Sequence, residues 1–256
     1  MNDNPYQSPE STGKLPNSNA AVIGRYGLTF LGVLIALGLL VALLLPAMRP
    51  SRESVRRAQC TNNLKQIALG LLKCEEQYGV LPPAHTVDAD GRPLHSWRTL
   101  ILPFIDQPRL YDYIDLTKPW DDPANKVASE TVLASYMCPT TFGTSGHTTY
   151  LAVLTSGGCF QATEGRKLSD ITDPHDSTIM LIEVDAEHSV PWMCPADADL
   201  DLVLGLTKSE SLAHNGRYNV ATVNGRVFSV ETSVDANKLR AMISIAGGDD
   251  AELDGD

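Results

Sequence analysis

The clearest hydrophobic pattern is an uncharged apolar run near the start of the chain. Leu28 to Leu45 reads LTFLGVLIALGLLVALLL, eighteen residues without a charged side chain. At a helical rise of about 1.5 Å per residue the run reaches roughly 27 Å, enough to cross the hydrocarbon core of a bilayer. A buried helix of a soluble protein is usually shorter and carries a polar stripe. The pattern therefore predicts a transmembrane helix at residues 28–45.

A second helical pattern follows Pro46 and Pro50, where we expect the helix to bend. Its apolar residues recur at spacings of 4, 3, 4, 3 and 4 and so fall on one helical stripe: Cys60, Leu64, Ile67, Leu71, Cys74 and Tyr78. Gly79 is expected to end the helix. We predict that the membrane helix continues into an amphipathic helix whose apolar stripe is covered by a globular domain.

From Val80 onward, short apolar segments alternate with turns. A short apolar segment is predicted at Trp97–Leu102, helical pieces at Pro103–Tyr113 and Ala236–Ile245, and strands at Thr148–Leu154 and Ser177–Val184. Asn219–Val230 has the alternation of a hairpin, for which Asn224-Gly225 predicts a type I′ turn. The fold class predicted is α+β, with a long N-terminal helix packed on an antiparallel sheet.

These patterns divide the chain into four parts. Residues 1–27 are rich in Asn, Pro, Ser and Gly and are expected to form a disordered tail or leader. The transmembrane helix at 28–45 follows, then a domain at 46–248, and finally an acidic, solvated tail at 249–256.

The acidic composition limits the classes of partner. The net charge of -11 speaks against a nucleic-acid partner, because phosphate binding requires clustered Lys and Arg. Five dispersed cysteines without a CxxC motif support neither a disulfide-framework miniprotein nor a zinc ribbon. Cys60 and Cys74 are four turns apart on the predicted helix and cannot bond to each other, whereas pairing among Cys138, Cys159 and Cys194 stays open.

Candidate chemistry is sparse. The six histidines are scattered, and Cys138, which precedes Pro139, is better explained as a packed thiol or disulfide partner than as a nucleophile. We therefore expect no catalysis and no bound cofactor. The alternating acids Asp197, Asp199 and Asp201 are weak calcium candidates, because they lack the EF-hand spacing and solvated loop acids are the simpler explanation.

Seven different motifs follow one another along the chain. They are LLLPAMRPSRESVRRAQCTNNLKQIALGL, YGVLPPA, SWRTLILPFIDQPRLYDYID, YMCPT, ITDPHDSTIMLIEV, VPWMCPADADLD and the hairpin that ends in NGRVFSV. Together they resemble the DUF1559 (SBP_bac_10) family, which is abundant in planctomycetes and related to type IV pilin-like proteins and type II secretion pseudopilins. The resemblance runs from Gly27 to Gly248. It implies a pilin-like domain whose N-terminal helix lies half in the membrane and half on an antiparallel sheet.

The prepilin signal of such proteins is only partly present. Gly27 and the nearby Arg25 are kept, so cleavage between Gly27 and Leu28 is implied as a processing step. Gly32, however, stands where family members with a working signal carry a glutamate, which is costly in lipid unless it is paired within an assembly. The departure favours an anchored monomer or small oligomer over a filament subunit.

Two features of the chain indicate opposite orientations of the domain. More basic residues follow the span than precede it, which by itself would place the domain in the cytoplasm: Arg49, Arg52, Arg56, Arg57 and Lys65, against Lys14 and Arg25. The resemblance implies the opposite, because pilin-like proteins carry similar basic residues and still export their domain. We expect a single-pass protein of the cytoplasmic membrane with its domain outside the cytoplasm.

The function expected from these observations is that of a membrane-anchored, pseudopilin-like structural or interaction protein of the cell envelope. Its expected partners are the lipid bilayer and other envelope or pilin-like subunits. The alternative is an extracytoplasmic module that binds a small solute or calcium through its acidic loops.

Overall fold

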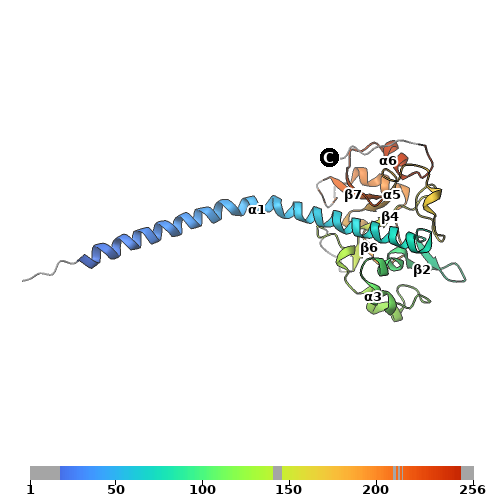
Figure 1. Cartoon of the computed structure of the whole chain (residues 1–256), viewed down its shortest axis with the longest axis horizontal. Coiled ribbons are helices and arrows are strands. Elements are labelled where there is room, and N and C mark those ends of the chain that lie inside the picture. The colour runs from blue at the N-terminus through green and yellow to red at the C-terminus, as the bar shows by residue number, and fades with distance from the viewer. Residues whose placement is uncertain (1–17, 141–145, 210–211, 213, 215, 249–256) are drawn as a thin grey trace, which may run out of the picture. The chain divides into compact units, whose positions relative to one another are not determined.

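The computed structural model describes residues 18–140, 146–209, 212, 214 and 216–248, with the side chains of 18–25, 27–28 and 43–52 left aside. The chain divides into two compact units, Met1–Arg52 and Glu53–Asp256. The second unit combines helices with antiparallel strands, so that the predicted α+β class is confirmed (Figure 1). The acidic tail at 249–256 and the first part of the predicted N-terminal tail, residues 1–17, lie outside the described residues.

The regular elements are mostly short. The α-helices are α1 (Ser18–Tyr78), α2 (Trp97–Leu100), α3 (Pro108–Tyr113), α4 (Lys126–Ser129), α5 (Leu200–Gly205) and α6 (Ala236–Ile243). The strands are β1 (His85–Val87), β2 (Pro93–Ser96), β3 (His147–Thr148), β4 (Tyr150–Ala152), β5 (Ile179–Glu183), β6 (Val190–Pro191), β7 (Arg217–Thr222) and β8 (Val227–Glu231). Six 3₁₀ turns connect them among the described residues: η1 (Leu102–Phe104), η2 (Pro123–Asn125), η3 (Ala134–Tyr136), η4 (Leu168–Asp170), η5 (Ala186–His188) and η6 (Leu206–Lys208).

Helix α1 starts earlier than the sequence pattern indicated. It begins at Ser18 rather than at Leu28, so residues 18–27, expected to belong to a disordered tail or leader, are helical. Adding a turn to an existing helix costs much less than nucleating one, and Ala20 and Ala21 favour that extension. The helix also runs without interruption through Pro46 and Pro50. Gly27 and Leu28, the predicted cleavage position, lie within it, and their side chains are outside the described set.

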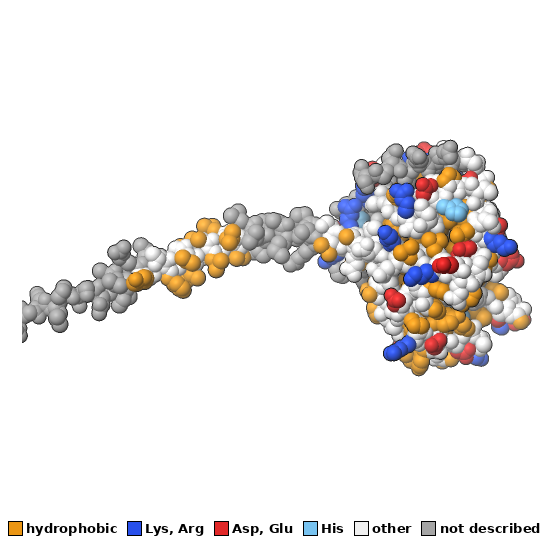
Figure 2. Space-filling model, viewed as in Figure 1, with side chains coloured by type: hydrophobic (Ala, Val, Ile, Leu, Met, Phe, Trp, Pro, Cys, Tyr) orange, Lys and Arg blue, Asp and Glu red, His pale blue; other side chains and the backbone are white. Residues whose placement is uncertain are grey.

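The apolar run is exposed over the part of α1 whose side chains are described, from Thr29 to Ala42. Its large apolar residues between Phe30 and Val41 have exposed fractions of 49–67% (Figure 2). Leu28 and residues 43–45 of the predicted span fall outside this set. Within the part of the chain that the structure describes, no helix reaches the length and apolarity that crossing a membrane requires.

The C-terminal part of α1 is a core element of the second unit. The predicted stripe is buried at Cys60, Leu64, Ile67, Leu71 and Cys74, whereas Tyr78 is exposed and meets Phe104 edge-on. The helix ends at Tyr78, as predicted, because Gly79 adopts a left-handed φ of 76° and its N–H bonds to the carbonyl oxygen of Glu75 at 2.7 Å.

The main sheet is antiparallel, with the strand order β4-β5-β7-β8. Alternate residues of its strands enter two different clusters of the core. One cluster includes the α1 stripe together with Tyr150, Ala152 and Ala221. The other includes Leu151 and Val220 with residues of α5 and α6. The sheet therefore separates the buried part of α1 from α5 and α6.

The hairpin of β7 and β8 is confirmed, but its turn is not type I′. A type I′ turn needs a positive φ at both central residues, and of the pair only Gly225 has one, at 81°. Gly225 N–H bonds to the carbonyl oxygen of Thr222, and Thr222 N–H bonds to that of Arg226. These bonds define a three-residue loop with a type I turn followed by a left-handed glycine bulge. The side chain of Asn224 accepts the N–H of Arg226 and favours this geometry.

Candidate functional site

A disulfide joins α1 to the loop that follows η3. Cys60 bonds to Cys138 with their Cα atoms 5.2 Å apart, and 78 residues separate them in sequence. Closing a loop of that length in the unfolded chain corresponds to about 4 kcal/mol of stabilisation in the loop-entropy account. Sequence reasoning left the partner of Cys138 open among Cys159 and Cys194, and both of these are free thiols, as is Cys74.

A second contact holds the same loop on the same face of α1. Asn63 lies one turn after Cys60, and its side-chain amide donates to the carbonyl oxygens of Ala134 and Met137 at 3.0 and 2.8 Å. Because residues three apart on a helix share a face, Cys60 and Asn63 position the loop together. Cys138 is therefore buried and disulfide-bonded. Of the two roles considered for it, the structure shows the disulfide partner and not a free nucleophile.

Two buried ionisable side chains lie beside this disulfide, and a third contacts one of them. His214, in the turn before β7, lies with its Nε2 atom 3.8 Å from the sulfur of Cys138 and 3.5 Å from Oε1 of Glu183 on β5. Its Nδ1 atom lies 3.5 Å from Oε1 of Glu53 on α1. His214 and Glu183 are almost completely buried, and Glu53 is partly exposed. Cys60, Cys138, Glu183 and His214 together form the Cys-Glu-His cluster.

The electrostatics of the Cys-Glu-His cluster follow from burial and from the two carboxylates. Burial disfavours the imidazolium and lowers the pKa of His214, but the contacts with Glu183 and Glu53 and their negative charges outweigh it, so that the pKa lies above its ordinary value. Oε2 of Glu183 accepts a 2.6 Å hydrogen bond from the amide of Asn219. Oε1 of Glu183 and Nδ1 of His214 are buried without a hydrogen-bond partner among the described residues.

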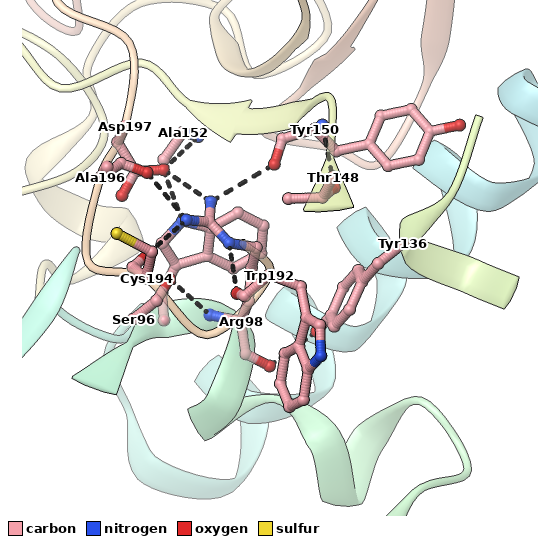
Figure 3. A network of polar contacts seen from close by, with 11 residues as sticks. Ser96, Arg98, Tyr136, Thr148, Tyr150, Ala152, Trp192, Cys194, Ala196 and Asp197 are labelled. Carbon is pink, nitrogen blue, oxygen red and sulfur yellow. Dashed lines mark hydrogen bonds and ion pairs between the residues drawn. The ribbon is translucent and has the colours of Figure 1, made fainter. Parts of the chain in front are cut away.

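A different polar network lies at the centre of the domain, around Arg98 (Figure 3). The guanidinium of Arg98 bonds to the carboxylate of Asp197 at 2.8 Å, with side chains that are 0% and 2% exposed. The other guanidinium N–H groups donate to backbone carbonyls of Tyr150, Trp192, Cys194 and Ala196. The donors of the fork are thus used, which a buried guanidinium requires.

The predicted calcium candidates have separate roles in the structure. Besides Arg98, Asp197 accepts hydrogen bonds from the indole of Trp97 and the N–H of Ala152. Asp199 caps the N-terminus of α5 by accepting the N–H of Leu202, and Asp201 is exposed in the first turn of that helix. Among the described residues, the donor set that could share one ion is the Cys-Glu-His cluster rather than these three acids. Calcium binding by Asp197, Asp199 and Asp201 stays a prediction.

The residues of the Cys-Glu-His cluster were not grouped by sequence reasoning. Glu183 is the one acid in the apolar strand IMLIE, so its burial could have been inferred from the pattern alone. His214 gives no such signal, because only the tertiary fold brings its turn to β5 and α1. One of the six histidines, His214, does lie beside other potential metal ligands. The fold brings these residues together, and their spacing in the sequence could not show it.

The fold and this site define a class: an α+β domain built on the second part of a long N-terminal helix and tied to that helix by a disulfide. Within that class, the family model described as SBP_bac_10, Protein of unknown function (DUF1559), matches residues 49–156. The matched segment contains Cys60, Asn63, Arg98 and Cys138, and it supports the family resemblance that the motifs indicated. Comparison with curated proteins and with solved structures gave no match.

Proposed function

We propose that this protein is a membrane-anchored, pseudopilin-like structural or interaction module of the cell envelope and performs no catalysis. One observation carries the proposal. Helix α1 is a single helix from Ser18 to Tyr78 whose earlier part presents exposed apolar side chains, and whose later part is the core of a folded domain. One helix thus serves as both the anchor and the core of the module.

The exposed part of α1 is too apolar to be left in water. Each large aliphatic or aromatic side chain gains about 1.5–3 kcal/mol when it is transferred from water to an apolar environment. The run from Thr29 to Ala42 contains no charged residue on any side of the helix, and this is typical of a segment surrounded by lipid rather than of one packed on a single partner surface. Contiguous exposed apolar surface of this kind marks a membrane or partner contact.

The disulfide supports the proposed orientation. Bonds such as Cys60–Cys138 persist in oxidising compartments and are rare in the cytosol. An extracytoplasmic domain therefore agrees with the disulfide, and the basic residues after the run contact lipid phosphates in this proposal. Gly32, in place of a glutamate, supports an anchored monomer or small oligomer that meets envelope or pilin-like subunits through its domain.

The proposal is tested by protease access in spheroplasts of cells that express the full chain. A protease added outside should remove the domain and leave a membrane-retained fragment that contains residues 28–52. The double variant Leu34→Arg/Leu37→Arg, which places two charges in the apolar run, should lose membrane retention. The double variant Val55→Arg/Val127→Arg changes two exposed apolar residues of the domain and should stay in the membrane.

Two results would contradict the proposal. A domain that resists external protease until the spheroplasts are lysed would place it in the cytoplasm. Equal membrane retention of the two double variants would show that the apolar run is not the anchor.

A further inference from the structure

The Cys-Glu-His cluster contains a donor set that suits a metal ion better than it suits hydrogen bonding. Two sulfurs, one carboxylate oxygen and one imidazole nitrogen lie within 4.8 Å of one another, and all four residues are buried. They come from α1, the loop after η3, β5 and the turn before β7. No adjacent pair in sequence supplies them, so the folded domain itself assembles the set.

The distances resemble the edges of a tetrahedron around zinc. Bond lengths of about 2.0–2.1 Å to nitrogen or oxygen and about 2.3 Å to sulfur place tetrahedral ligands roughly 3.3–3.8 Å apart. Nε2 of His214 is 3.5 Å from Oε1 of Glu183 and 3.8 Å from the sulfur of Cys138. Charge-assisted hydrogen bonds would be shorter, at about 2.7–2.9 Å. The two sulfurs are closer together than two ligands of one zinc ion, because a covalent bond joins them.

Neighbouring side chains orient two of the four donors, as the hydrogen-bond partners of metal ligands do in metal sites. Asn219 donates to Oε2 of Glu183 and leaves Oε1 directed at His214, buried and with no hydrogen-bond partner in the part of the chain that the structure describes. Glu53 lies against Nδ1 of His214, on the far side of the ring from the cluster. A carboxylate that accepts the N–H of a ligand histidine fixes its tautomer and raises its basicity.

We propose that reduction of the Cys60–Cys138 disulfide converts the Cys-Glu-His cluster into a structural site for one divalent cation of the zinc class. Two thiolates with imidazole and carboxylate select zinc over calcium or magnesium, which prefer oxygen ligands alone. Four protein ligands fill a tetrahedral zinc ion and leave no open position for a substrate. The site therefore stabilises the domain and adds no catalytic activity to the proposed function.

The conversion balances as two separate steps. A thiol reductant supplies two electrons and two protons, so that the sulfur–sulfur bond breaks, Cys60 and Cys138 become thiols, and the reductant becomes a disulfide. The metal ion then displaces the two thiol protons and any proton on Nε2 of His214, and it forms bonds to two thiolates, Glu183 and the imidazole. The ion keeps its charge of +2 throughout. An oxidising compartment thus favours the disulfide, and a reducing one favours the metal site.

The test uses Co²⁺ as a spectroscopic probe of the purified full chain. A phosphine reductant opens the disulfide by taking oxygen from water, which supplies the two protons to the sulfurs. The reduced, folded chain should bind one Co²⁺ with intense visible bands of a tetrahedral site and a thiolate-to-metal charge-transfer band, and Zn²⁺ should displace the Co²⁺. The untreated chain, with its disulfide intact, should show neither band.

Variants assign the ligands and their supports. Cys138→Ser leaves the Cys60 thiolate alone and should weaken Co²⁺ binding and the charge-transfer band, and His214→Ala should weaken Co²⁺ binding at least tenfold. Glu53→Gln should weaken it about 10- to 100-fold, as expected for a group behind a ligand histidine. Cys194→Ser, at a half-buried free thiol, and His188→Ala, at an exposed histidine, are the matched controls and should bind as the reduced wild type does.

Three results would contradict a metal site at the Cys-Glu-His cluster. Absence of Co²⁺ binding by a reduced chain that keeps its native circular dichroism would overturn the proposal, and so would unchanged binding in both Cys138→Ser and His214→Ala. If reduction alone unfolds the domain, Zn²⁺ should restore the native circular dichroism at stoichiometric concentration. Failure to restore it would overturn the proposal as well.

Discussion

The carboxylate of Asp197 and the guanidinium of Arg98 form a 2.8 Å ion pair that solvent does not reach. The pair connects α2 to the segment before α5, and the same Asp197 oxygen also accepts the N–H of Ala152 on β4. Arg98 adds backbone carbonyls of residues 150, 192, 194 and 196 to this network (Figure 3). One buried charge pair therefore joins α2, strand β4 and the segment that precedes α5.

Arg98→Met should destabilise the domain strongly. It leaves the Asp197 carboxylate buried without its cation, and breaking such a pair from one side costs about 3–5 kcal/mol. The matched control is Arg92→Met, which removes an exposed arginine paired with Asp88 and Asp90 and should cost less than about 1 kcal/mol. Thermal unfolding of both variants measures the difference, and equal losses would show that the buried network does not stabilise the fold.

Removing the disulfide should also lower stability. Cys138→Ser is expected to lose about 4 kcal/mol, because the unfolded chain regains the entropy of the loop that the bond closes. Urea unfolding without reductant measures the loss from the transition midpoint. Cys194→Ser serves as the control, since that thiol is free and half-buried. A midpoint for Cys138→Ser equal to that of the control would contradict the disulfide.

The approach of α1 to Ile105 predicts a cost for a small substitution. A Cβ atom at Gly70 would lie 2.6 Å from Cγ2 of Ile105, so Gly70→Ala forces a shift that costs about 1–3 kcal/mol, partly offset by the better helix propensity of alanine. Gly205→Ala, at the end of α5, meets no atom within 4 Å and is the control. Thermal unfolding should separate the two variants. A Gly70→Ala protein more stable than the control would contradict the close packing.

Asp185 should make the domain sensitive to acid. Burial raises the pKa of its carboxyl group, but hydrogen bonds from His188 and Ser209 outweigh burial and lower the pKa below its ordinary value. A carboxyl group with a depressed pKa in the folded state stabilises the fold above its unfolded pKa of about 3.9, and this contribution disappears as the pH falls through the folded pKa. Asp185→Asn removes the titration.

The contribution of Asp185 is measured by the change in melting temperature between pH 7 and pH 3, in the wild type and in Asp185→Asn. The melting temperature of the wild type should fall more between pH 7 and pH 3 than that of Asp185→Asn, and the two proteins should differ most at pH 7. An identical pH dependence in both proteins would show that Asp185 does not contribute to acid sensitivity.

The features that the sequence predicted are those set by local patterns. The buried stripe of α1, the helix end at Gly79 and the hairpin of β7 and β8 each follow from residue spacing or from a single glycine. The hairpin shows the limit of such patterns, because Asn-Gly suits both a type I′ turn and a three-residue loop. The number of residues between the strands decides between them, and this depends on the register with Val227.

The site could not be predicted in the same way, because its members meet only in the folded chain. Cys60 and Cys138 are far apart in sequence, and the stripe explains Cys60 fully as a core residue. Arg98 did give a signal, since it interrupts the apolar run WRTLIL, and a charge inside a buried segment needs a partner. Nothing in the spacing identified Asp197 as that partner, and its alternation with Asp199 and Asp201 pointed to calcium instead.

Anchoring by the apolar run is tested most directly by ultracentrifugation of lysed cells that express the full chain, followed by extraction of the pellet at high pH and then with detergent. We predict that the protein sediments with the membranes, resists high pH and is released only by detergent, whereas Leu34→Arg/Leu37→Arg stays in the supernatant. Full-length wild-type protein in the supernatant before any detergent is added would contradict a membrane anchor in α1.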